Sequence, residues 1–278
     1  MLGQDVVRAA RAAGHDVAAL ARADLDITDP AAVQAAVAAH RPEAIVNCAA
    51  YTDVDGAEAD EPTARAVNAE AAGNLARAAS AAGAQLVHVS SDYVFDGTAR
   101  EPYREGDDTS PLSAYGRSKL AGEQSVAAAG TGHAIVRSSW LFGVGGPNFV
   151  ATMLRLAGER DRVAVVTDQV GCPTWTGHLA PALVTVAEHR AGGVHHVAGA
   201  GACSWNELAA EAFSQAGVQC PVDPASSAEM ARPAPRPAWS VLGTTREDTP
   251  RLPAWQDGVA GYLGARAGGE RPAPVGPA

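Results

Sequence analysis

The sequence predicts an α/β fold, a doubly wound parallel sheet accompanied by a smaller, loop-rich lobe. In the first half of the 278-residue chain, short apolar segments alternate with longer segments of helical pattern. Strands that alternate with such helices form a parallel sheet, because each helix returns the chain across one face of it. Polar residues follow several apolar segments, and ligands bind beyond the carboxyl ends of strands in such sheets.

The first quarter of the chain predicts two helices and two strands. Apolar residues share one helical face over residues 5–13, and Gly14 is expected to end that helix. The run 16–20 then predicts a short strand. An Asp-Pro pair suits a helix N-cap and first turn, so the next helix is expected over residues 29–40. The apolar residues 44–47 predict a buried strand.

The same alternation continues to residue 138. A long helix is expected over residues 62–82, followed by a strand over 85–90. The next helix is expected to begin near residue 111 or 113 and to extend to 129, and a further strand covers 134–138.

The second half of the chain is less regular. Short strands are expected over residues 163–166 and 194–197, and a helix over 207–216, with Gly- and Pro-rich loops between them. We therefore expect a sheet-bearing domain (residues 1–140 plus about 163–198), a smaller lobe (about 141–162 plus 199–265) and a flexible tail (266–278).

Composition excludes some classes of partner. The net charge is -10 and no cluster of basic residues occurs, which argues against binding to nucleic acid. No apolar run approaches the roughly 20 residues of a membrane span, and the N-terminus does not resemble a signal peptide. The cysteines lack metal-ligand spacing, so we expect no metal and free thiols in a cytoplasmic protein. They are Cys48, Cys172, Cys203 and Cys220.

Tyr115 and Lys119 form a candidate acid–base pair. Their spacing places both side chains on one face of a helix. A neighbouring ammonium favours the phenolate and is expected to lower the tyrosine pKa, which suits the transfer of a proton to a carbonyl oxygen. Lys119 is the only lysine, and arginine differs from it in shape and reach. The alternative is a solvated lysine beside a partly buried tyrosine.

Polar side chains at the ends of two predicted strands extend this candidate site. Ser90 and Ser91 end one apolar strand, where a hydroxyl can bond a substrate carbonyl, although both can equally cap the turn. The segment 47–52 leaves another strand and carries small residues that let a flat ligand approach. Asn68 lies within a helical stretch, either as a satisfied core amide or as a support for the site.

These segments resemble the dTDP-4-dehydrorhamnose reductase family of extended short-chain dehydrogenases, in the order of that family. The matching runs are residues 25–30, 46–52, 90–97, 115–123, 136–140, 168–174 and 236–237. The resemblance implies a Rossmann-like fold with a substrate-binding lobe. It implies catalytic roles for Tyr115, Lys119 and Ser91, cofactor contacts for Gly3, Asp26, Ile27, Ala50, Tyr51, Thr52, Tyr115 and Lys119, and substrate contacts for Asp92, Tyr93, Trp140, Asn148 and Arg236.

The implied reaction is reduction of dTDP-4-dehydro-L-rhamnose by NADPH or NADH. Arg22 follows the strand predicted over residues 16–20, where strict NAD enzymes carry an acidic residue, which favours NADPH unless it is simply a surface arginine. The family pattern has Asn before Ser240, where this chain has Trp239, and this departure affects the expected substrate contacts.

The start of the chain also departs from the family. The family opens with a strand and a glycine-rich turn, of which only Gly3 matches, as the third glycine. We hypothesise that Met1 is an internal methionine and that the natural protein extends upstream by roughly ten residues, about one strand and turn. Without that strand its neighbours would be unpaired, and the chain would bind the cofactor poorly.

Other functions remain open at this point. The chain could act on another nucleotide sugar as a reductase or epimerase. It could also be a non-catalytic regulatory subunit of the kind that serves methionine adenosyltransferase, or an inactive fragment. The expected partner is a nucleotide sugar, with no nucleic acid and no membrane, and the expected oligomeric state is monomer or homodimer.

Overall fold

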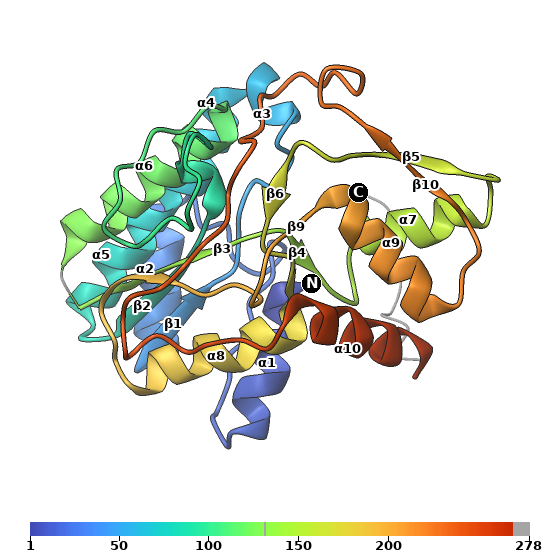
Figure 1. Ribbon diagram of the computed structural model, residues 1–278. Helices are drawn as coiled ribbons and strands as arrows, with labels where there is room; N and C mark the ends of the chain where they lie inside the picture. Colours follow the sequence, from blue (N-terminus) through green and yellow to red (C-terminus); the bar gives the residue numbers. More distant parts are fainter. Residues whose placement is uncertain (131, 269–278) are drawn as a thin grey trace.

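A four-stranded parallel sheet lies at the centre of the computed structural model, which describes residues 1–130 and 132–268 (Figure 1). In spatial order its strands are β1 (Ala44–Asn47), β2 (Gln85–Ser91), β3 (Ala134–Ser138) and β8 (Gly193–His196). Every neighbouring pair is parallel. The predicted strands coincide with these four or are displaced by a single residue, and the doubly wound class is confirmed.

Helices cover both faces of the sheet. One face packs against α1 (Leu2–Ala12) and α8 (Thr176–Glu188), and the other against α2 (Pro30–His40), α5 (Ala71–Ala81) and α6 (Ala114–Ala129). Alternate residues of each strand serve the two faces, so that Val87 and Val136 join the first core while Leu86 and Ile135 join the second. Each such side chain stabilises the fold by about 2 kcal/mol through burial.

The helices begin where local chemistry places them. The Asp29 carboxylate accepts hydrogen bonds from the amides of Ala31 and Ala32 at the start of α2. Ser113 caps α6 in the same way, through the amide of Gly116. The predicted helix 62–82 is present, but it is divided. It consists of α4 (Glu61–Arg65), a π-helical turn η1 (Ala66–Glu70) and α5.

The predicted strand over residues 16–20 is wrong. These residues are almost all exposed and have no regular structure. Within the described ranges 1–130 and 132–268, β1 pairs only with β2, so its other edge has no strand beside it. A short strand without a hydrogen-bonding neighbour has nothing to hold it extended. The prediction that 44–47 is a buried strand also needs correction, since only Asn47 is fully buried.

The smaller lobe has its own cores and its own short sheet. It contains α7 (Phe149–Ala157), α9 (Trp205–Ala216) and α10 (Trp255–Ala267), which lie beside the main sheet in Figure 1. Strand β5 (Val163–Val166) pairs with β10 (Val222–Ala225). The assignment of 163–166 to the sheet-bearing domain is therefore wrong, because this strand belongs to the lobe.

The remaining elements are short. They are α3 (Gly56–Ala59), η2 (Asp92–Val94), β4 (Leu141–Phe142), β6 (Val170–Gly171), β7 (Thr174–Trp175) and β9 (Cys203–Ser204). The predicted helix 207–216 is confirmed within α9. The predicted tail began two residues too early, because α10 includes residues 266–267, and residues 269–278 lie outside the described part of the chain.

Gly122 lets α6 pack directly on the π-helical turn. An added Cβ there would overlap the carbonyl oxygen of Asn68, and backbone cannot move aside as a flexible side chain can. We expect Gly122→Ala to lower the free energy of unfolding by about 1–3 kcal/mol, measured by urea denaturation. Gly264 of α10 has open space around its Cβ position, so Gly264→Ala should be neutral or stabilise by up to about 1 kcal/mol. Equal effects of the two changes would contradict this explanation.

Candidate active site

Ser91, Tyr93 and Tyr115 gather where β2 ends and α6 begins. The Ser91 hydroxyl accepts a hydrogen bond from the amide of Tyr93 at 3.1 Å and thereby caps the η2 turn. The Ser91 and Tyr115 side chains are also hydrogen-bonded. The rings of Tyr93 and Tyr115 meet edge to face, with centroids 5.8 Å apart. Ser91 therefore caps the turn and also reaches the tyrosine, so the two readings of this serine are compatible.

Tyr115 is a protonated phenol at neutral pH. Burial raises its pKa to about 12, the charge of Asp92 acts in the same direction, and the hydrogen bond with Ser91 opposes both. The pKa of Tyr115 is therefore raised where the sequence predicted a lowered value, because burial is the largest effect on it. A phenol that keeps its proton can serve as a general acid.

Lys119 is buried, with 2% of its surface exposed. Its ammonium donates a hydrogen bond to the carbonyl oxygen of Val89 at 2.7 Å. Burial lowers its pKa to about 8, while the charges of Glu123 and Cys48 act in the opposite direction. The alternative of a solvated lysine is thus excluded, and an ammonium with further N–H groups lies against the end of β2.

Asp92 lies beneath the site and does not line it. It is 2% exposed, and its carboxylate accepts hydrogen bonds from the hydroxyls of Ser91 and Ser139, each at 3.0 Å. Ser240 bonds to the same carboxylate. The resemblance predicts that Asp92 contacts substrate, whereas in the structure its carboxylate oxygens accept hydrogen bonds from serine hydroxyls of the chain itself.

A buried ion pair supports the floor of the site. Arg137 of β3 donates to both carboxylate oxygens of Glu123 on α6, at 2.9 and 2.7 Å. Ser90 donates to the same carboxylate at 2.6 Å. The pair joins α6 to the sheet one turn beyond Lys119, so it helps to hold that lysine in place.

Asn68 connects the loop after β1 with α6. Its amide oxygen accepts from the amide of Tyr51 at 2.8 Å, and its nitrogen donates to the Tyr51 carbonyl and to the Ser118 hydroxyl. Asn68 is therefore a satisfied buried amide that also supports the site. It lies in the π-helical turn, and such turns are frequent at functional sites. Ala50 and Tyr51 are half-buried in this loop, and Thr52 is exposed.

Aromatic rings form the lobe side of the site. Trp140 stacks on Trp205, with centroids 3.6 Å apart and planes within 6°. Trp140 has a φ of 48°, a strained backbone conformation for a bulky residue. Asn148 was expected to face substrate, but its side chain caps α7 through the Ala151 amide and donates to the carbonyl of Gly143. Its polar atoms are thus used in positioning α7.

Arg236 is held by Asp55, which lies before α3. The guanidinium donates to both carboxylate oxygens, at 2.9 and 3.0 Å, and Arg232 joins the same carboxylate at 2.9 Å. These bonds hold the pKa of Asp55 at about 2, chiefly through Arg236. Both arginines also act electrostatically on Tyr93, so positive charge borders the tyrosine side of the site.

The residues expected near the adenine and the phosphates all precede β1 in the chain. Asp26 is exposed and accepts from the amide and hydroxyl of Thr28, which lowers its pKa, and the charge of Arg22 adds to that effect. Ile27 packs against the core under α2. Gly3 lies in the first turn of α1, near Cys48, and this helix has no side-chain cap.

These residues fit a nicotinamide dinucleotide. The start of α1 offers uncapped amides suited to phosphate, Arg22 supplies an exposed cation, and Lys119 supplies a buried one. Cys48 lies between Gly3 and the lysine: an added Cβ on Gly3 would meet it, and the charge of Lys119 acts on its thiol. The start of α1, Cys48 and Lys119 therefore lie near one another and provide groups of the required kinds.

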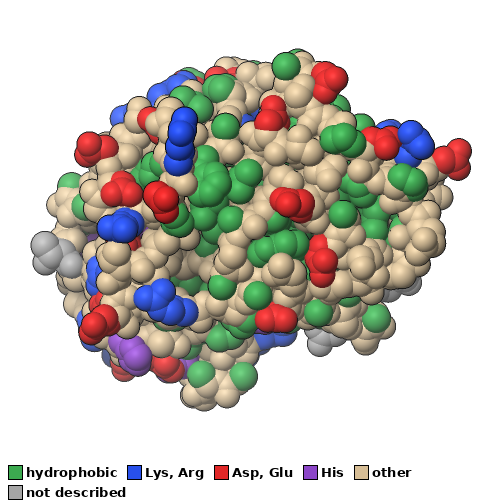
Figure 2. All heavy atoms as spheres, viewed as in Figure 1, with side chains coloured by type: hydrophobic (Ala, Val, Ile, Leu, Met, Phe, Trp, Pro, Cys, Tyr) green, Lys and Arg blue, Asp and Glu red, His purple; other side chains and the backbone are tan. Residues whose placement is uncertain are grey.

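The surface over this region is uneven in polarity. Figure 2 shows hydrophobic side chains gathered near the middle of one face, between the sheet-bearing part and the lobe, with acidic and basic groups scattered around them. Within residues 1–130 and 132–268, no group of His, Cys, Asp and Glu could hold a metal ion, and no helix is long and apolar enough to cross a membrane. The four cysteines are free thiols.

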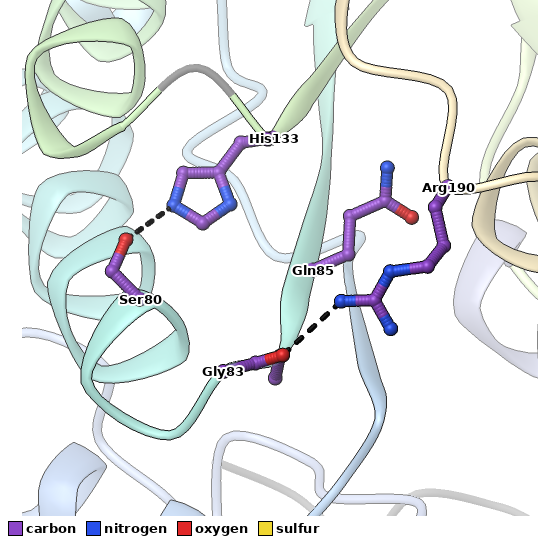
Figure 3. A pocket seen from close by; sticks show the side chains of 7 residues that line it. Ser80, Gly83, Gln85, His133 and Arg190 are labelled. Atoms are coloured by element: carbon purple, nitrogen blue, oxygen red, sulfur yellow. Dashed lines mark hydrogen bonds between the residues drawn. The ribbon is translucent and has the colours of Figure 1, made fainter.

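A separate cavity of about 290 Å³ lies at the opposite end of the sheet, where β2 and β3 begin (Figure 3). His133 bonds to Ser80 at 2.9 Å, and Arg190 donates to the Gly83 carbonyl just beyond α5. These bonds tie helix ends to the sheet. The cavity is remote from Tyr115, since it lies at the amino ends of the strands.

Four residues of the site were not predicted. Ser139 and Ser240 bind Asp92, and Glu123 and Arg137 form the ion pair behind it. Ser139, Glu123 and Arg137 lie within runs that carried the family resemblance, which was the available signal. Their pairing joins distant parts of the chain and could not be deduced from spacing.

Comparison with known proteins identifies the family. The family model described as RmlD substrate binding domain matches residues 1–267. The dTDP-4-dehydrorhamnose reductase of Streptomyces griseus is 48% identical over 254 residues, which cover 88% of this chain and 83% of that protein. A probable dTDP-4,6-dihydroxy-2-methyloxan-3-one 4-ketoreductase of Streptomyces antibioticus is 47% identical over 88% of this chain and 84% of its own length.

A solved structure agrees with both matches. It is that of dTDP-4-dehydrorhamnose reductase from Bacillus anthracis in complex with NADP, which superposes with a TM-score of 0.92 at 37% identity and covers 95% of each chain. Sequence, family pattern and fold thus lead to one assignment: the chain belongs to the dTDP-4-dehydrorhamnose reductase (RmlD) family.

Proposed function

We propose that this protein reduces the 4-keto group of dTDP-4-dehydro-L-rhamnose, with NADPH or NADH, to give dTDP-L-rhamnose. The observation that carries the proposal is the protonated Tyr115, which is hydrogen-bonded to Ser91 at the carboxyl end of the sheet. A buried lysine lies one helical turn further along α6. Membership of the reductase family supports the choice of substrate.

The bound nicotinamide would supply hydride to the sugar carbon. Tyr115 gives its proton to the carbonyl oxygen, because burial keeps that proton on the phenol until a stronger acceptor develops. Lys119 holds the cofactor ribose with its remaining N–H groups and presents positive charge as the phenolate forms. Ser91 bonds the reacting oxygen.

The two parts of the molecule divide the binding. Residues 1–140 with the segment from α8 to β8 would bind the cofactor, and the lobe with α7, α9 and α10 would bind the sugar nucleotide.

Arg22 favours NADPH, since it is an exposed guanidinium near the expected adenine contacts. Trp140 offers a flat apolar face to the sugar nucleotide, and Arg236, although held by Asp55, adds positive charge near its diphosphate. We place the reaction in the cytoplasm, in a monomer or homodimer.

A second substrate is a related dTDP-keto sugar. The similarity to the 4-ketoreductase of Streptomyces antibioticus favours it, because that relative is almost as similar in sequence as the rhamnose reductase. A non-catalytic regulatory role is less well supported, because Tyr115 is hydrogen-bonded to Ser91 and Lys119 bonds to Val89 near the end of the same strand.

A panel of keto-sugar nucleotides tests the proposal. We expect oxidation of NADPH, followed by its absorbance, with dTDP-4-dehydro-L-rhamnose at a kcat/KM at least about tenfold above that for other dTDP-keto sugars, since one good contact discriminates by about that factor. NADH is expected to give a lower rate. Turnover of another keto sugar alone would support the second candidate, and binding without turnover would support the regulatory role.

A further inference from the structure

Asp92 is a buried carboxylate that is bonded only to neutral groups. Its side chain accepts hydrogen bonds from Ser91, Ser139 and Ser240, which come from β2, from the end of β3 and from the segment after Arg236. No ion pair reaches it from any residue within 1–130 and 132–268. A carboxylate in such a place changes its protonation state more readily than one fixed by a cation.

The Ser91 hydroxyl has one proton, and it donates this proton in a hydrogen bond to Asp92. Ser91 donates to Oδ1 of Asp92 at 3.0 Å and accepts from the amide of Tyr93 at 3.1 Å. A serine hydroxyl donates once and accepts twice. While Asp92 is ionised, Ser91 can therefore only accept from Tyr115 or from a ligand, and it cannot donate to a reacting oxygen.

At the second carboxyl oxygen of Asp92, Oδ2, the direction of the hydrogen bond is fixed. The amide of Cys172 donates to the Ser139 hydroxyl at 3.3 Å, so the Ser139 proton is directed to Oδ2 of Asp92 at 3.0 Å. Oδ2 is thus the acceptor oxygen in either protonation state. A proton taken up by Asp92 would lie on Oδ1, facing Ser91.

We propose that Asp92 is a positioning residue that sets the direction of the Ser91 proton. While Asp92 is a carboxylate, the Ser91 hydroxyl donates its hydrogen bond to Asp92. When Asp92 is a carboxylic acid, it donates to Ser91 instead, and the Ser91 hydroxyl can then donate to Tyr115 or to the substrate oxygen. The proposal rests on the proposed reductase function for its effect on rate. The hydrogen-bond reversal itself does not require turnover.

Burial and the neutral groups around Asp92 allow it to titrate near neutral pH. Burial raises the pKa of Asp92 to about 6, against the opposing effect of Ser240, Ser139 and Ser91. The titratable groups that face it are Tyr93 beside it, Tyr115 from α6 and Cys172 from the loop before β7. All three have raised pKa values and are neutral in this range, so Asp92 is the group among them that changes charge.

The pH dependence of kcat tests the proposal. In the full chain with NADPH and saturating keto-sugar nucleotide, kcat should rise roughly tenfold from pH 7 to pH 5 as Asp92 gains its proton. In Asp92→Asn the amide oxygen faces Ser139 and the amide nitrogen donates to Ser91, so kcat should be high and flat across this range. An unchanged pH profile in Asp92→Asn would overturn the proposal.

Serine variants separate this role from a structural one. Ser139→Ala and Ser240→Ala each remove a donor that favours the carboxylate, so each should move the pH profile upward by about one unit or more, with KM little changed. Ser138→Ala is the matched control, because Ser138 is a buried neighbour whose hydroxyl has no partner. A shift in the control as large as that in Ser139→Ala, or no shift in either test variant, would contradict the assignment.

A spectroscopic titration gives a readout that is independent of turnover. With tyrosines labelled at 13Cζ, the Tyr115 signal, identified by its loss in Tyr115→Phe, should move in step with the titration of Asp92. This pH-dependent change in chemical shift, the Tyr115 step, should vanish in Asp92→Asn. It should shrink strongly in Ser91→Ala, because Ser91 transmits the protonation of Asp92 to Tyr115. A full step in Ser91→Ala would overturn the proposal. Absence of turnover in the wild type together with an intact step would contradict the proposed function alone.

Discussion

Replacing Tyr115 with phenylalanine is expected to lower kcat by about 10³-fold, within the range that a positioned general acid contributes. The change removes a single hydroxyl, and the ring keeps its edge-to-face contact with Tyr93. KM for the sugar nucleotide should change by less than about threefold, because the hydroxyl acts mainly as charge develops on the oxygen. The measurement is initial-rate NADPH oxidation over a range of substrate concentrations.

Tyr262→Phe is the matched control for this loss. Tyr262 is buried in the lobe core with Phe142 and Trp255, away from Tyr115. It should retain turnover within about twofold of the wild type, since a single change away from the reacting groups acts mainly on stability. Retention of near-normal turnover in Tyr115→Phe would overturn the assignment of the general acid.

The elements that sequence reasoning placed correctly carry their own local signals. The Asp29 cap at α2 and the Ser113 cap at α6 lie at the ends of periodic apolar patterns, and such patterns depend only on neighbouring residues. The strand predicted over 16–20 failed because a strand also needs a partner at its edge, and local pattern does not provide one.

The candidate site divides in the same way. Tyr115 and Lys119 lie one helical turn apart, so their proximity could be deduced from spacing. The pKa of Tyr115 could not be deduced in this way, because burial by the surrounding chain has the largest effect on it. Ser240 and Asp92 are separated by about half of the sequence, and such a contact becomes visible only in the folded chain.

Glu123→Ala is expected to lower the free energy of unfolding by about 3–5 kcal/mol, because it leaves the Arg137 guanidinium buried without its anion. Both side chains are nearly inaccessible, at 5% and 6% exposed, and Ser90 also loses its acceptor. The loss is a large part of the roughly 5–15 kcal/mol that stabilises a typical domain. Urea denaturation followed by circular dichroism measures it.

Two comparisons show whether burial is the cause. Arg155 and Glu159 form an ion pair of the same chemistry and length, 2.7 Å, but both side chains are more than half exposed. Arg155→Ala should therefore cost no more than about 0.5 kcal/mol. The double change Glu123→Met with Arg137→Met should be less destabilising than Glu123→Met alone, because no uncompensated charge remains in the interior. A double variant less stable than Glu123→Met would mean that the hydrogen bonds of Arg137 to its other neighbours, and not the missing counter-charge, dominate the energy of this pair.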